Sequence, residues 1–138
     1  MKKKWLYLLL ALAILVVFVS PAFASSTAYI QYVSSGKAVD NHATHGSASS
    51  VSVSQTSNLN TETGDYYGST DKTNYGVRKT KTKKGSSIAG SMSVKGYSGS
   101  TSANYISGVS NNITVYLVVQ PAVAASTGQW EIAGTWSP

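Results

Sequence analysis

The sequence predicts an all-β protein, a single antiparallel β-sandwich or small barrel of about six to eight short strands, preceded by a cleavable N-terminal signal helix. Beyond residue 24, apolar and polar residues alternate repeatedly, and no segment has the apolar spacing of a helix. Serine, threonine, tyrosine and valine are frequent there, which is typical of a β-sheet with one solvated face. The pattern of residues 1–24 predicts the signal helix.

That N-terminal pattern has the three parts of a secretory signal. Lysines at positions 2–4 precede an uninterrupted apolar run over residues 5–19, and Ala22-Phe23-Ala24 forms a small-x-small cleavage motif. The run is shorter than the roughly 20 apolar residues that span a bilayer comfortably. We therefore expect a signal peptide over residues 1–24 and a secreted, extracellular domain over residues 25–138.

Cleavage would lower the positive charge of the protein. The full chain has 11 Lys+Arg and 5 Asp+Glu, a net charge of +6, and loss of three lysines leaves 8 − 5 = +3. The chain contains no cysteine, which excludes disulfides, thiolate nucleophiles and zinc–thiolate sites. A single domain held together by packing and backbone pairing is the expectation for a chain of this length.

The alternation predicts strands separated by Gly-, Asn- and Ser-rich turns. They cover residues 29–33, 50–55, 75–82, 88–94, 103–109, 113–120 and 129–136, and residues 36–48 and 58–72 are expected to be long loops. The segment 113–120 is apolar on both faces, so it is predicted to be the most central strand. Trp130 and Trp136 share one face of the last predicted strand. This face is predicted to belong to the core, and the alternative is an exposed platform on which a sugar stacks.

The candidate binding site is a basic cluster in which 6 of the 8 cations of residues 25–138 lie within 13 residues that contain no acid. Its members are Lys72, Arg78, Lys79, Lys81, Lys83 and Lys84. On a strand, both faces would be cationic, which an exposed edge strand or a protruding hairpin tolerates. Such lysines serve either to block edge-to-edge sheet association or to attract an anionic polymer or surface.

The functional prediction is a non-enzymatic protein that binds an anionic cell-wall polymer, a glycan or a membrane surface through this basic strand or hairpin. Tyr66, Tyr67 and Tyr75 are the candidate aromatic contacts. They form no recognisable base-stacking module, so no specific nucleic acid is expected as a partner. No catalytic motif is present: Gly-x-Ser-x-Gly does not occur, and Glu62 with Asp65 is a poor carboxylate pair for glycoside cleavage.

No cofactor and no metal site are predicted. The weak candidates for a metal site are Asp40, His42 and His45, which are expected in a loop. A second group of oxygen ligands resembles a calcium loop, but its glycine is displaced from the position of the sharp turn and no acid follows at the twelfth position, so an Asx-rich turn is the simpler interpretation. This group is Asn58, Asn60, Glu62 and Asp65.

An alternative function remains open. Residues 49–57 and 86–102 alternate small polar with modestly apolar residues and carry hardly any charge. Membrane-inserting hairpins have this pattern, and so do ordinary sandwich strands. Combined with the predicted export and the basic cluster, it keeps a membrane-active toxin or bacteriocin-like antimicrobial protein as the second hypothesis.

Overall fold

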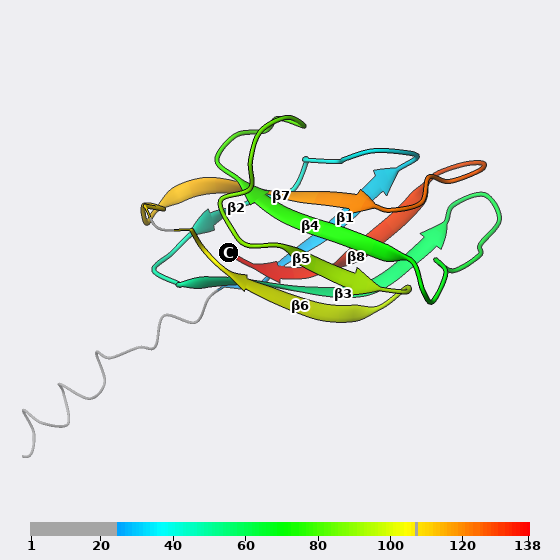
Figure 1. Cartoon of the computed structure of the whole chain (residues 1–138), viewed down its shortest axis with the longest axis horizontal. Helices are drawn as coiled ribbons and strands as arrows, with labels where there is room; N and C mark the ends of the chain where they lie inside the picture. The colour runs from blue at the N-terminus through cyan, green and yellow to red at the C-terminus, as the bar shows by residue number, and fades with distance from the viewer. Residues whose placement is uncertain (1–24, 107) are drawn as a thin grey trace, which may run out of the picture.

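The computed structural model describes residues 25–106 and 108–138, which form eight strands in two antiparallel four-stranded sheets (Figure 1). The strands are β1 (Thr27–Val33), β2 (His42–His45), β3 (Ser50–Asn60), β4 (Lys72–Arg78), β5 (Met92–Lys95), β6 (Gly99–Asn104), β7 (Ile113–Pro121) and β8 (Trp130–Ser137). The described residues contain no helix, so the all-β prediction is confirmed for them. The predicted signal helix falls on residues 1–24, outside the described residues.

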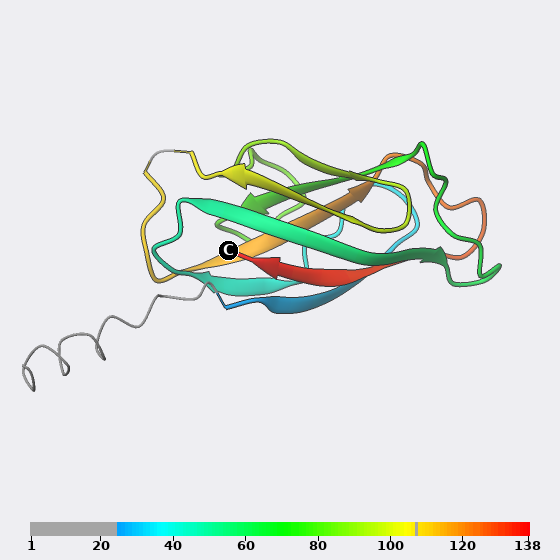
Figure 2. The same cartoon turned by 90° about the horizontal axis from the view of Figure 1, so that it is seen from below.

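The strand order is β1-β8-β3-β6 in the first sheet, called sheet A, and β2-β7-β4-β5 in the second, called sheet B. The two sheets lie in separate layers with the core between them, as Figures 1 and 2 show from two directions. Each sheet keeps two edge strands, so the arrangement is an open sandwich and not a closed barrel. The chain changes sheet at every connection except the one between β4 and β5.

The core is built from the inward-facing residues of both sheets. Trp136 is 1% exposed and Leu117 is fully buried, which confirms the prediction that the tryptophan face of the last strand is core. Trp130 packs edge-on against Tyr67, with ring centroids 4.9 Å apart, and its Nε1 donates to the Val123 carbonyl at 3.0 Å. The interpretation of these two tryptophans as an exposed sugar platform is therefore wrong.

Close backbone contact between β8 and β3 depends on a glycine. The register between these strands shifts between Gln55 and Ser57, which marks a β-bulge. Gly134 lies opposite Gln55, and a Cβ atom at this glycine would approach the Ser54 carbonyl oxygen to 2.0 Å. Only glycine therefore fits at this position without moving the backbone.

A buried polar layer also connects the sheets. The Tyr29 hydroxyl donates to the Tyr75 oxygen at 2.9 Å, and the Tyr75 hydroxyl donates to Gln55 Oε1. Gln55 Nε2 in turn donates to the Gly96 carbonyl at 3.0 Å. Because both phenols are buried away from water, their pKa values rise: that of Tyr29 to about 12, and that of Tyr75 further above its ordinary value.

Several strand predictions need correction. The strand expected over residues 88–94 is the shorter β5 (Met92–Lys95), the strand expected over residues 103–109 is β6 (Gly99–Asn104), and β3 continues to Asn60, into the loop expected over residues 58–72. The predicted strand over residues 75–82 ends at Arg78, and the residues after Arg78 form a loop. Residues 42–45, predicted as part of a loop, form β2, which pairs with β7. Strand β7 has neighbours on both sides and is buried on much of both faces, as its sequence predicted.

Candidate functional site

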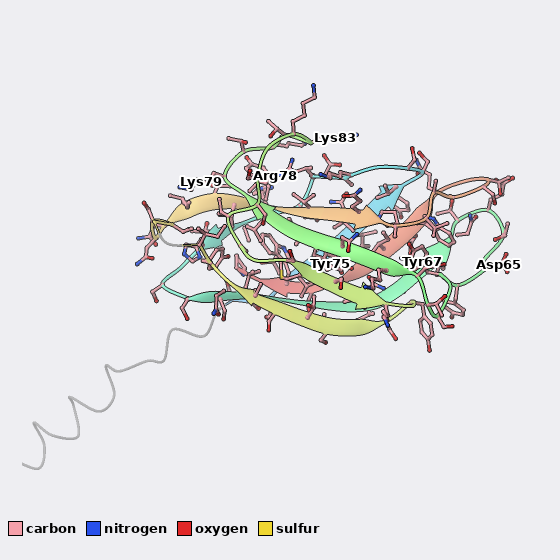
Figure 3. The ribbon with its side chains drawn as sticks, in the orientation of Figure 1. Asp65, Tyr67, Tyr75, Arg78, Lys79 and Lys83 are labelled. Carbon is pink, nitrogen blue, oxygen red and sulfur yellow. The ribbon has the colours of Figure 1, made fainter. Side chains whose placement is uncertain are left out.

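The basic cluster is divided by the fold. Arg78 ends β4, and the connection to β5 carries the exposed Lys79, Lys81, Lys83 and Lys84; these four side chains belong to what we call the basic loop, residues 79–84. In the view of Figure 3 the loop extends outward past β7, with Lys83 near its outer end and Arg78 at its base. The cations are therefore presented by a protruding loop between the paired strands β4 and β5. Of the two settings expected from the sequence, an edge strand or a protruding hairpin, the two-faced cationic edge strand is not formed.

Lys72 lies apart from the basic loop. It begins β4, six residues before Arg78, which is about 20 Å along an extended strand. There it stands opposite Lys95 of β5. The nearby connections place two tyrosines in contact with each other: Tyr66, 63% exposed, and Tyr97, 49% exposed, with ring centroids 4.8 Å apart. Neither Lys95 nor Tyr97 was singled out from the sequence.

The other two aromatic candidates are internal. Tyr67 is 2% exposed, and its hydroxyl donates to the Lys72 carbonyl at 3.0 Å and accepts from the Val123 amide at 3.0 Å. Tyr75 belongs to the buried polar layer between the sheets. Of the three candidate aromatic contacts, Tyr66 alone presents its ring to the outside.

Arg78 is the unusual member of the cluster, because its side chain is buried. It is 5% exposed, its Nη1 donates to the Thr82 carbonyl, and its Nε has no hydrogen-bond partner. Within residues 25–106 and 108–138, the one ion pair joins Lys81 to Asp40, so Arg78 has no carboxylate partner there. A buried charge without a counter-charge is costly, which makes Arg78 the unusual group of this cluster.

A small hollow of about 190 Å³ lies beside this guanidinium on the outer face of sheet B. The strand registers explain its composition, because Ala38 bridges Val119 while Gln120 pairs with Asn74. This register brings Lys37, Gln120 and Asn74 into one row across the sheet. The hollow is lined by Lys37, Asn74, Tyr75, Gly76, Arg78, Gly85, Ser87, Val118 and Gln120. We call it the Arg78 pocket.

Gly76 creates room in the Arg78 pocket. On β4, residues 74, 76 and 78 point to the same side, so the missing side chain at Gly76 leaves a gap between Asn74 and Arg78. Ser87 closes the gap from above: its Oγ accepts from the Val77 amide at 3.1 Å and from the Ala89 amide at 3.2 Å. Amide, hydroxyl and cationic groups therefore surround a space in front of the sheet.

A larger hollow of about 330 Å³ lies on the outer face of sheet A. Its polar lining consists of hydroxyls, with Ser100 Oγ donating to Ser54 Oγ at 3.3 Å, and no charged side chain takes part. The smaller Arg78 pocket is the better candidate site, because it combines an unpaired buried cation with neutral hydrogen-bonding groups. From the sequence, Arg78 was grouped with the surface lysines, and Lys37 was missed because it is distant along the chain.

The candidate metal ligands do not converge. His42 and His45 lie at opposite ends of β2, where an odd spacing directs them to opposite faces: His42 is exposed and His45 is 2% exposed. The Asp40 carboxylate instead accepts from Lys81 Nζ at 3.1 Å. No group of three or more His, Cys, Asp or Glu side chains suited to a metal occurs among the described residues.

The calcium candidates form a turn. Asn60 Nδ2 donates to the Thr127 carbonyl at 2.8 Å, while Asn60 Oδ1 accepts from the amides of Glu62 at 2.9 Å and Thr63 at 3.1 Å. Asn58 is fully buried and donates to Thr73 Oγ1 at 3.0 Å. The amide oxygen of Asn60 is thus engaged in an Asx-turn, the simpler interpretation of this segment.

The Lys81–Asp40 ion pair attaches the basic loop to the β1–β2 connection, and we expect it to contribute little to stability. Both side chains are well exposed, at 60% and 69%. Asp40→Asn should therefore change the free energy of unfolding by no more than about 0.5 kcal/mol. Urea denaturation in low and high salt measures this change. A loss of about 2 kcal/mol or more would mean that the pair is shielded from solvent.

None of the residues that the structure describes belongs to a helix with the length and apolarity needed to cross a membrane. Comparison of the chain with protein-family models, with curated proteins and with solved structures gave no match. Function is therefore inferred from the chain's own geometry and charge.

Proposed function

We propose that the protein is a secreted, non-enzymatic binding protein that attaches to an anionic polymer or surface of the cell envelope through the basic loop. The observation that carries this proposal is the presentation of four exposed lysines on one protruding loop, with Asp40 as the acid that pairs with one of them. Clustered cations attract polyanions over a range set by the ionic strength. The extracellular location rests on the signal pattern of residues 1–24.

The geometry of the loop favours contact with an extended partner. Lys79, Lys83 and Lys84 form no ion pair within the described residues, and their side chains are exposed. Because the loop projects outward past β7, a large surface or a long polymer would reach these lysines without contacting the sheets (Figure 3). Flexible lysines acting as point charges suit a partner recognised by charge density.

Removing the two lysines at the end of the loop tests this proposal. Lys83→Ser/Lys84→Ser should weaken binding to anionic phosphatidylglycerol vesicles or to purified cell wall at low salt. Near an anionic surface each lysine contributes about 1 kcal/mol, so the pair is worth about 2 kcal/mol, or roughly thirtyfold in affinity. Co-sedimentation over a salt series measures the change, and binding of the unaltered protein should fall as salt rises.

The chain offers a matched control. Lys72→Ser/Lys95→Ser removes the same number of charges from the other end of β4, and binding should change less than about threefold. Equal losses in the two double variants would show that net charge, and not the basic loop, governs attachment. Salt-independent binding would refute the electrostatic proposal.

The membrane-active alternative is distinguished by dye release from the same vesicles. One of the two segments that suggested it, residues 49–57, lies largely in β3, which is paired on both sides and buries Val51 and Val53. Inserting this strand into lipid would require sheet A to open. We therefore expect vesicle binding without leakage at micromolar protein, and leakage at that concentration would favour the toxin hypothesis instead.

A further inference from the structure

We infer that the Arg78 pocket binds a single oxyanion group, a carboxylate or a phosphate, carried on a hydroxylated unit such as one acidic sugar or one glycerol phosphate. This inference rests on the proposed function, because such a unit is the repeating element of the anionic envelope polymers that the basic loop would attract. Such a pocket would add specificity to the attachment. The basic loop would bind according to the charge density of the partner, whereas the Arg78 pocket would recognise the chemical groups of one unit.

The electrostatic state of Arg78 is the first support. Its guanidinium is buried, donates to the Thr82 carbonyl through Nη1 and leaves Nε without a partner. A guanidinium presents five N–H donors in a planar fork that matches the oxygens of a carboxylate or a phosphate. A ligand oxyanion would supply the counter-charge that the described residues do not offer to Arg78.

The lining of the pocket is the second support. Lys37 contributes another cation from the β1–β2 connection, and it is held there by the two backbone hydrogen bonds between Ala38 and Val119, at 2.9 and 3.0 Å. Asn74 and Gln120 face the same space, and their amides both donate and accept hydrogen bonds. Such neutral groups suit the hydroxyls of a sugar or a polyol better than they suit a bare inorganic ion.

The size of the pocket is the third support. The volume of about 190 Å³ is below the range of about 300–1,000 Å³ that encloses drug-sized ligands. One monomer unit fits such a space, whereas an oligosaccharide does not. Gly85 and Ser87, which follow the basic loop directly in the chain, border the same pocket, so a polymer held there would continue past the exposed lysines.

The test measures binding of small acids to the full protein at low salt, with glucuronate, glycerol phosphate and inorganic phosphate as probes and glucose as the neutral control. Titration followed by the side-chain amide signals of Asn74 and Gln120 in ¹⁵N correlation spectra should show saturable shifts with at least one acid and none with glucose. Glucuronate and glycerol phosphate distinguish the two sources of the oxyanion. Equal response to inorganic phosphate would show that the hydroxylated part is not recognised.

Two variants separate binding from a structural role. Arg78→Gln should lower the affinity for the acid at least about tenfold, and without ligand its melting temperature should be equal to or higher than that of the unaltered protein, because an unpaired buried charge is removed. Gly76→Ala keeps the charge and partly fills the pocket: its Cβ would lie 3.4 Å from Ser87 Oγ, an ordinary contact. It should fold normally and bind the acid more weakly.

The outcomes distinguish failure of this inference from failure of the proposed function. If the protein binds vesicles or cell wall but no small acid shifts the pocket signals, the pocket inference is overturned and the loop proposal stands. If Arg78→Gln melts several degrees lower and acid binding persists, Arg78 is a structural residue and the inference is overturned. If small acids bind the pocket but neither cell wall nor vesicles are bound, the pocket stands and attachment through the loop fails.

Discussion

Gly134→Ala should destabilise the protein by about 3 kcal/mol or more. A Cβ atom at this position would lie 2.0 Å from the Ser54 carbonyl oxygen and 3.0 Å from the Gln55 Cα atom. Both of these atoms belong to the backbone, so no side-chain rotation relieves the overlap. Relief requires β8 to move away from β3, the neighbour against which it forms most of its pairs. Urea denaturation followed by tryptophan fluorescence measures the loss.

The matched control is Gly46→Ala. A Cβ atom at Gly46 would meet nothing within 4 Å, and the glycine does not adopt a positive φ. We expect this substitution to change the free energy of unfolding by less than about 0.5 kcal/mol. Similar midpoints for Gly134→Ala and the unaltered protein would contradict the close approach between β3 and β8.

Stability should fall steeply as the pH rises from about 10 to about 12. Burial raises the pKa of Tyr29 from 10.0 to about 12, and it raises the pKa of Tyr75 as well. In the unfolded chain these phenols ionise near pH 10, whereas in the folded protein they stay protonated. Between these values the unfolded state binds fewer protons than the native state, so the free energy of unfolding decreases with pH. Well below pH 10 the stabilising contribution of the buried, protonated phenols is fully present.

The size of this loss of stability is set by the difference between the folded and unfolded pKa values of the phenols. Two pKa units at Tyr29 alone correspond to about 3 kcal/mol. Urea midpoints at about pH 9 and pH 11.5 measure the loss, and Tyr29→Phe should make the pH dependence shallower because it removes one ionisable group from the buried layer. Tyr97→Phe, at an exposed position, should leave the dependence unchanged. A midpoint that does not change over this range would mean that water reaches the phenols.

The sequence predicted those parts of the fold that depend on apolar alternation. Val115 and Leu117 identified β7 as central, and Trp136 identified the inner face of β8, because large apolar side chains have a strong preference for the interior. Strand β2 could not be predicted in this way. Its four residues, His42 to His45, have no apolar period, and the strand exists because it pairs with β7.

The buried polar layer was beyond sequence reasoning for a related reason. Gln55 is 2% exposed, and its side-chain amide forms hydrogen bonds with the Tyr75 hydroxyl and the Gly96 carbonyl. Neither partner belongs to β6 or β8, the strands that pair with β3. Local pattern assigns glutamine to the surface, since burial of an amide is tolerable only when partners are present. Those partners are set by the packing of the two sheets.

The candidate site was predicted in part. The concentration of positive charge around Lys79 to Lys84 was evident from spacing, and the exposure of these lysines agrees with their charge. Alternation, however, continues unbroken past Arg78, so the end of β4 was missed. The burial of Arg78 and the approach of Lys37 depend on the β4–β5 connection lying over sheet B and on the bridge at Ala38, both of which are tertiary features.

The position of β8 between β1 and β3 has a consequence for the order in which the molecule is assembled. The first strand has the last strand as its sheet neighbour, and Thr27 pairs with Trp136 across 136 − 27 = 109 positions. An incomplete polypeptide that emerges from the ribosome therefore has no template on which its first strand can dock. Contacts between segments so far apart in the sequence form slowly, and docking of β1 in sheet A must wait until β8 has been synthesised.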